Sequence, residues 1–159
     1  MSLQKIISGG QTGTDRGALD AALEVGFPCG GWCPEGREAE DGPIPQRYPL
    51  QVMPGAGYRK RTIRNIQDSD GTAILCFGEL VGGSALTLAQ CRRLDKPYIV
   101  IDGLIVDATR AGIQLAAFAR QYVIQTLNVA GPSEGRSPGA GTYAKAVVGA
   151  LLLLRSRDF

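Results

Sequence analysis

One glycine-rich stretch decides the fold: Ser8-Gly9-Gly10-Gln11-Thr12-Gly13-Thr14-Asp15-Arg16. An apolar segment, residues 3–7, precedes it, and the apolar residues of the segment that follows, 18–25, recur at helical spacing. The pattern predicts a strand, a tight turn and a helix, with Thr12, Thr14 or Asp15 as the helix cap. Unpaired amides and the positive end of the helix dipole make such a turn a natural seat for phosphate or another anion.

Two better-known phosphate motifs are missing from this turn. The Walker pattern requires Gly-Lys followed by Ser or Thr, and the turn holds no lysine. The dinucleotide fingerprint requires G-x-G-x-x-G, whereas the glycines here read G-G-x-x-G. Two interpretations therefore stay open at this point, an anion-binding turn and a tight turn that binds no ligand.

Length and composition indicate a single domain over residues 1–159. A chain of this size buries roughly two thirds of its unfolded surface, and 44% hydrophobic with 20% charged residues is typical of a globular protein. A net charge of +2 gives no reason to expect nucleic acid or a membrane surface as a partner. The longest apolar run, 146–154, is too short to span a bilayer, and no basic-then-apolar leader is visible, so we expect a cytoplasmic protein.

The chain contains no histidine. Ser-His-Asp and Cys-His catalysis, histidine general bases and most zinc or iron sites are therefore excluded within one chain. Cys76 and Cys91 fall in strand and helix patterns and are expected to be buried small hydrophobic residues. Cys29 and Cys33 flank a turn, where a redox or metal role is the less favoured alternative. The cysteine spacing is not that of a metal site, so we predict no directly ligated metal.

Strand, glycine-rich turn and helix recur along the chain. Residues 72–77 are a continuous apolar run, typical of a strand buried on both faces. The turn 78–84 follows, with Ser84 as the candidate cap of a helix over 85–93. Further strands are expected at 98–101 and 126–130, and further helices at 107–122, where Asp107 is a candidate cap, and at 142–155.

This alternation predicts an α/β fold, a Rossmann-like doubly wound parallel sheet in a three-layer α/β/α arrangement. In such a sheet the turns that follow the strands emerge at one edge, where ligands bind. The turns 8–16, 78–84 and 131–141 should therefore meet in one crevice.

Two more segments are candidates to frame that crevice. Residues 33–50 form a long loop with five charges before Gly42 and four prolines, which favours an ordered lid; a solvated insertion is the alternative. Residues 58–69 are basic and predict a helix with Arg61 and Arg64 as neighbours on its surface. That helix either clamps an anion through its arginines or is a solvated face.

Seven blocks of the sequence resemble the family named "putative molybdenum carrier". They are SGGQTGTDR (8–16), GGWCPEGR (30–37), EDGPI (40–44), RT (61–62), DSD (68–70), GGSALT (82–87) and LNVAGP (127–132). That family is grouped with Rossmann-like proteins that include the molybdenum cofactor carrier and the phosphoribohydrolases named lysine decarboxylases. The resemblance implies a fold that binds the phosphate of a nucleotide or a pterin, with molybdenum cofactor or a nucleotide as the ligand.

The same relatives imply an enzymatic alternative. The phosphoribohydrolases release a base from a nucleoside monophosphate and carry P-G-G-x-G-T-x-x-E, in which the backbone holds phosphate and the glutamate serves the sugar chemistry. Residues 81–90 keep Gly82 and Gly83, but Ala85 or Leu86 replaces the third glycine and Gln90 stands where an acid is needed. A glutamine cannot act as a carboxylate, so hydrolysis would require a substitute acid. The candidates are Asp15, Glu35, Glu40 and Asp41.

We therefore expect a protein that binds a phosphate-bearing small molecule, with an enzyme of nucleotide turnover as the alternative. Backbone amides would hold the phosphate, hydroxyl groups would donate hydrogen bonds, and arginines would neutralise the charge. A homo-oligomer of two or more copies is expected from relatives of this fold. The predicted ligand-binding residues are Gly9, Gly10, Thr12, Gly13, Thr14, Arg16, Arg37, Arg61, Gly82, Gly83, Ser84, Thr87 and Gly131.

Overall fold

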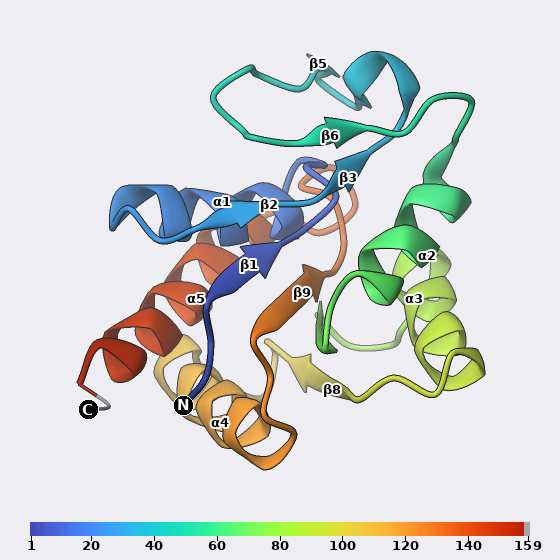
Figure 1. Cartoon of the computed structure of the whole chain (residues 1–159). Helices are drawn as coiled ribbons and strands as arrows, with labels where there is room; N and C mark the ends of the chain where they lie inside the picture. Colours follow the sequence, from blue (N-terminus) through green and yellow to red (C-terminus); the bar gives the residue numbers. More distant parts are fainter. Residues whose placement is uncertain (158–159) are drawn as a thin grey trace.

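A five-stranded parallel sheet forms the centre of the computed structural model, which describes residues 1–157. The strands are β1 (Lys5–Ile7), β2 (Cys29–Gly30), β7 (Gly71–Cys76), β8 (Tyr98–Asp102) and β9 (Thr126–Ala130). Their order across the sheet is β2-β1-β9-β7-β8 (Figure 1). All neighbouring pairs in this sheet are parallel, as the alternation of strands and helices predicts.

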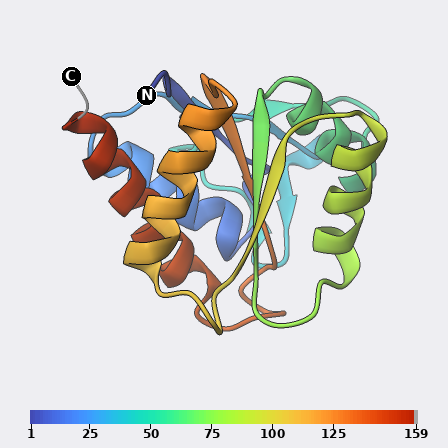
Figure 2. The same ribbon diagram turned by 90° about the horizontal axis from the view of Figure 1, so that it is seen from below.

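Helices cover both faces of the sheet. One face carries α1 (Thr14–Glu24), α4 (Ala108–Gln121) and α5 (Ala140–Ser156), and the other carries α2 (Tyr58–Gln67) and α3 (Gly82–Arg93). Figure 2 shows the sheet edge-on between these two helix layers. The three-layer α/β/α arrangement is therefore confirmed. Within residues 1–157, no helix has the length and apolar character that crossing a membrane requires.

The strand order identifies a permuted version of a common topology. β9 is the last strand in the sequence but lies in the middle of the sheet, between β1 and β7. Counted from β7, the order reads 2-1-3-4-5, one of the two usual doubly wound orders. The two ends of the chain adjoin, since Arg155 Nε donates to the Leu3 carbonyl at 3.0 Å. The topological switch point, where ligands bind in such sheets, accordingly falls between β7 and β9.

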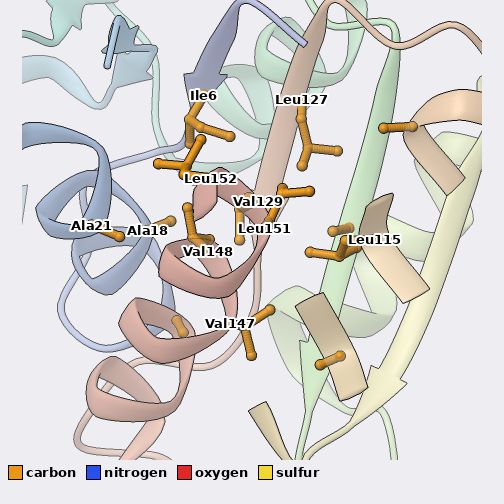
Figure 3. Close-up of a cluster of buried hydrophobic side chains, with 14 of the residues drawn as sticks. Ile6, Ala18, Ala21, Leu115, Leu127, Val129, Val147, Val148, Leu151 and Leu152 are labelled. Atoms are coloured by element: carbon orange, nitrogen blue, oxygen red, sulfur yellow. The ribbon is translucent and has the colours of Figure 1, made fainter. Parts of the chain in front are cut away.

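The main core lies between the sheet and the layer formed by α1, α4 and α5. Ile6, Leu127 and Val129 of the strands are fully buried against Val148 and Leu151 of α5 (Figure 3). Within the apolar run 146–154, one helix face packs inward, as the composition predicts, and its buried residues are Val147, Val148, Leu151 and Leu152. Burying each such side chain contributes about 2 kcal/mol to the stability of the folded protein. This packing holds the carboxyl ends of the strands in place.

The helix caps differ from the sequence-based expectation at the two functional turns. Gly13 is the N-cap of α1, and Thr14 Oγ1 donates to the Pro132 carbonyl at 3.0 Å instead of capping. Val81 precedes α3, so Ser84 lies inside the first helical turn. The expected cap at Asp107 is confirmed, since its carboxylate accepts from the Arg110 N–H at 2.9 Å. The cap predictions for Thr14 and Ser84 were wrong. The Thr14 hydroxyl contacts a distant backbone carbonyl and Ser84 lines a cavity, and the local sequence encodes neither contact.

The long loop after β2 is ordered. It contains β3 (Trp32–Cys33), the short helix η1 (Glu35–Arg37), the hairpin β4 (Glu38–Ala39) with β5 (Gly42–Pro43), and β6 (Gln51–Val52). β3 pairs with β6 in parallel. The Arg37 guanidinium donates to the carbonyls of Ile44, Pro45, Tyr48 and Leu50 at 2.8–3.4 Å. One side chain therefore joins both ends of the loop.

The cysteines are free thiols, with Cys33, Cys76 and Cys91 buried and Cys29 half-buried. Burial raises the pKa of each thiol above its ordinary value. Cys76 and Cys91 are buried as expected. Raised pKa values disfavour the thiolate that redox or metal chemistry needs.

Candidate functional site

Three turns meet at the carboxyl edge of the sheet, and a cavity of about 350 Å³ opens between them. We call it the switch-point cavity, because it lies beyond β7 and β9. Its walls come from the first turn, from α2, from the start of α3 and from the segment after β9. Its lining residues are Gln11, Asp15, Glu40, Tyr58, Arg61, Thr62, Val81, Gly83, Ser84, Leu86, Thr87, Ala130, Gly131, Pro132, Ser133 and Arg136.

The start of α3 forms the part of this wall best suited to an anion. The first amides of a helix have no acceptor within the helix, and those of α3 follow Val81 with no side-chain cap among the described residues. A Cβ built on Gly83 would meet nothing within 4 Å, so open space lies beside this turn. Ser84 is only 7% exposed, and its hydroxyl makes no hydrogen bond within residues 1–157. Thr87 Oγ1 donates to the Gly83 carbonyl at 2.9 Å and so stiffens the turn.

Two arginines flank this turn. Arg61 of α2 lies close to the first turn. A Cβ on Gly9 would stand 1.8 Å from Arg61 Nη1, so any residue other than glycine would clash at this position. Its Nε is buried and has no hydrogen-bond partner among the described residues. The Arg136 guanidinium lies against Gly82, where a Cβ would stand 2.2 Å from its Nη1. Both arginines thus line the same cavity as the first turn of α3.

Several amides of the first turn already have acceptors within the chain itself. The Gln11 N–H donates to the Asp15 carboxylate at 3.2 Å, and the Gly10 N–H donates to the Ser8 hydroxyl at 3.4 Å. Asp15 is 4% exposed and stands 3.7 Å from Arg61 Nη1. Burial raises the pKa of the Asp15 carboxyl, while the Arg61 guanidinium and the hydrogen bonds from Gln11 and Gly9 act in the opposite direction. An internal carboxylate therefore stands where the glycine pattern predicts an external anion.

The turn after β9 is filled in the same way. Glu134 accepts from the N–H groups of Gly139 at 2.7 Å and Gly141 at 3.0 Å, at the start of α5. These two hydrogen bonds hold the pKa of Glu134 below its ordinary value. In the described chain, no carboxylate accepts amide hydrogens from the turn that opens α3, and this turn lines the switch-point cavity.

The β4–β5 hairpin closes over the crevice with two acidic residues at its tip. Arg16 holds Asp41 through two hydrogen bonds of 2.6 and 2.9 Å. Glu40 accepts from the Thr12 hydroxyl and from the Gly135 N–H, the latter at 2.8 Å. The Thr12 hydroxyl is the main reason that the pKa of Glu40 is lowered. Behind the hairpin tip lies a second cavity of about 560 Å³, bordered by Arg16, Asp41 and Lys145 among others.

The structure distributes the predicted site residues over several positions. Arg61, Gly83, Ser84, Thr87 and Gly131 line the switch-point cavity together with Asp15 and Glu40. The second cavity is lined by the predicted residues Thr12, Gly13, Arg16, Glu40 and Asp41. Some predicted residues line neither cavity in the part of the chain that the structure describes. They are Gly9, Gly10, Thr14, Glu35, Arg37 and Gly82.

Sequence reasoning missed several lining residues, chiefly Gln11, Tyr58, Ser133 and Arg136. Arg136 was within reach of that reasoning, since it is the arginine in the turn 131–141 already assigned to the crevice. Within residues 1–157, no three Cys, Asp or Glu side chains come together as a set of metal ligands.

Fold and site together define a Rossmann-like α/β protein with a cleft at its topological switch point. Residues 6–152 match the family described as the circularly permutated YpsA SLOG family, and the chain belongs to it. The strand order, which becomes a usual one when counted from β7, agrees with that description.

A solved structure provides a second comparison. The chain is 43% identical to a putative molybdenum carrier protein from Syntrophus aciditrophicus SB, whose crystal structure was determined at 1.45 Å resolution. The two structures agree with a TM-score of 0.92 over 95% of this chain and 96% of that chain. This confirms the resemblance seen in the sequence. No curated protein matches the chain.

Proposed function

We propose that this protein binds a phosphate-bearing small molecule in the switch-point cavity, with the phosphate on the first turn of α3. One observation carries the proposal: the first turn of α3 lines the cavity with no side-chain cap and with open space beside Gly83, whereas the carboxylates of Asp15 and Glu134 accept amide hydrogens in the other two turns. Arg61 and Arg136 would neutralise the phosphate from either side. The hydroxyl of Ser84 would donate a further hydrogen bond.

The body of the ligand would lie toward α2. Tyr58 lines the cavity, is 52% exposed and has the Arg61 guanidinium 5.4 Å from its ring centroid, so a flat heterocycle such as a base or a pterin would pack against the exposed part of the ring. The name of the similar crystal structure suggests molybdenum cofactor as a cargo, with a nucleotide as the other choice. The phosphate of either ligand fits the α3 turn. Any molybdenum would be held by the pterin, because the described side chains group no set of metal ligands.

A second candidate function is hydrolysis of the N-glycosidic bond of a nucleoside monophosphate. It is favoured by the position of Glu40, an ionised carboxylate in the same cavity as the proposed phosphate seat. Against it stands Gln90, an amide where the hydrolases carry an acid, which is 5% exposed and accepts from Arg93 Nε at 2.7 Å. Incubation with purine and pyrimidine monophosphates, followed by chromatography for free base, separates a carrier from an enzyme.

The decisive experiment replaces Gly83. In Gly83→Asp a carboxylate enters the anion seat, and like-charge repulsion of several kcal/mol predicts a loss of about 100-fold or more in affinity. The probes are inorganic phosphate and adenosine monophosphate, measured by isothermal titration calorimetry. Gly83→Ala is the matched control, because a Cβ at this position meets nothing within 4 Å. Equal affinities for the Asp and Ala variants would refute the proposed seat.

A further inference from the structure

Glu40 is the partition between the two cavities. It is the residue shared by the lining of the switch-point cavity and that of the second cavity. The second cavity is the larger of the two, about 560 against 350 Å³, and lies on the side of α1 and α5. The two spaces therefore adjoin at the Glu40 side chain.

Two donors converge on the Glu40 carboxylate, and the Ser133 hydroxyl lies beside them. The Thr12 hydroxyl and the Gly135 N–H donate to Oε1, and Ser133 is near enough to help lower the pKa of the carboxyl. Thr12 Oγ1 accepts from the Glu134 N–H at 3.2 Å, which turns its own hydrogen toward Glu40. A hydroxyl pair with a backbone amide is a donor set that suits a phosphate or carboxylate oxygen.

Glu40 differs from the other two internal carboxylates in how it is held. Asp15 and Glu134 belong to the turns that they fill, four to seven residues from the amides they accept from. Glu40 comes from a separate hairpin, 28 residues from Thr12 and 95 from Gly135. That hairpin has only two residue pairs, Glu38 with Pro43 and Ala39 with Gly42. Glu40 lies at its tip and is exposed to solvent. Arg16 on Asp41 and the Gln11 amide on the Glu38 carbonyl hold the hairpin itself, so the Glu40 side chain can turn away by breaking its own hydrogen bonds while the hairpin stays in place.

We propose that Thr12, Ser133 and Gly135 form a second anion seat, which Glu40 occupies in the free protein. A ligand with two acidic groups places its phosphate on α3 and its second acidic group on this seat, and the Glu40 side chain moves aside. This inference rests on the proposed function for the first anion. It identifies the ligand class as an elongated small molecule with two anionic groups, which spans both cavities.

The test follows the amides of Gly83 and Gly135 by ¹⁵N NMR while inorganic phosphate is added. In the wild-type protein we expect the Gly83 signal to saturate first and the Gly135 signal to respond only at much higher phosphate. In Glu40→Ala the second seat is empty, so the Gly135 signal should saturate at a phosphate concentration at least ten times lower than in the wild type. Glu38→Ala is the matched control, because it removes the same charge from the same hairpin and leaves Glu40 in place.

Two results would overturn the second seat: a Gly135 response in Glu40→Ala equal to that of the wild type, or an equal gain in Glu38→Ala. Gly83→Asp separates this inference from the proposed function. If the α3 seat is wrong, the Gly83 signal fails to respond in the wild type, while Glu40→Ala still gains its response at Gly135. The double variant Gly83→Asp/Glu40→Ala should keep the Gly135 response and lose the Gly83 response, and the same spectra show whether each variant is folded.

Discussion

At the scale of single residues, the pair Asp15–Arg61 determines what the first glycine turn can do. Both side chains are largely buried, 5% and 13% exposed, with 3.7 Å between Oδ2 and Nη1. The carboxylate accepts the amide hydrogens of the turn, and the guanidinium balances its charge. A buried charge that loses its partner is strongly destabilising. The pair therefore holds the turn in shape and keeps Arg61 at the wall of the cavity.

Arg61→Met should lower the free energy of unfolding by about 3 kcal/mol at pH 7, because Asp15 is left buried and unpaired. Without Arg61, the already raised pKa of Asp15 rises further, and a protonated Asp15 needs no cation. The deficit relative to the wild type should therefore shrink as the pH falls toward 4. Urea denaturation of both proteins at several pH values measures this difference in the free energy of unfolding. A deficit that stays constant with pH would show that lost packing, not the unpaired carboxylate, is the cause.

At residue scale, the sequence predicted part of the site. Gly83, Ser84 and Gly131 line the cavity because turns that follow parallel strands meet at one edge, which the alternation of elements already implies. The sequence did not predict that Asp15 fills its own turn. From the sequence, Asp15 was interpreted as a helix cap or as a candidate catalytic acid. Whether an amide is free depends on where a side chain folds back, and the sequence does not show this. Only the coordinates distinguish a turn that is already filled from one that is open.

At the scale of elements, the loop 34–50 shows how an irregular segment becomes ordered. Its prolines restrict the unfolded chain, as the sequence predicts. In the folded state, Arg37 satisfies four backbone carbonyls across the loop. The arginine was expected to neutralise a ligand, and its guanidinium instead contacts the loop. A side chain with five donors in a fixed fork suits this position.

Arg37→Gln should loosen this loop without unfolding the protein. The shorter amide cannot reach all four carbonyls, so amide hydrogen exchange over residues 34–50 should quicken at least tenfold, while α5 stays protected. Hydrogen exchange followed by mass spectrometry gives both regions in one experiment. Arg47→Gln is the control, because Arg47 is an exposed arginine of the same loop that contacts Tyr48 and Asp20. Similar exchange in the two variants would contradict the role given to Arg37.

At the scale of the whole molecule, the sequence indicated the fold class but not the strand order. Alternating strands and helices require a parallel sheet. The insertion of β9 between β1 and β7 depends instead on distant pairings such as Ile6 with Leu127 and Ala73 with Val129. These pairings bring the turn 131–141 between the other two turns, and the switch point follows from them. The chain reaches a usual doubly wound topology only when it is read from β7.

One continuous core joins these strands to α1, α4 and α5, so we expect the domain to unfold as a single unit and ligand binding to stabilise all of it. Adenosine monophosphate at 100 times its dissociation constant should add about 2.7 kcal/mol. For a domain of this size, that corresponds to a rise in Tm of roughly 5–10 °C. Differential scanning calorimetry should show one transition that moves as a whole, and Gly83→Asp should remove the rise without dividing the transition. Two transitions, of which only one moves, would contradict the single domain, whereas an equal rise in Gly83→Asp would place the phosphate away from α3.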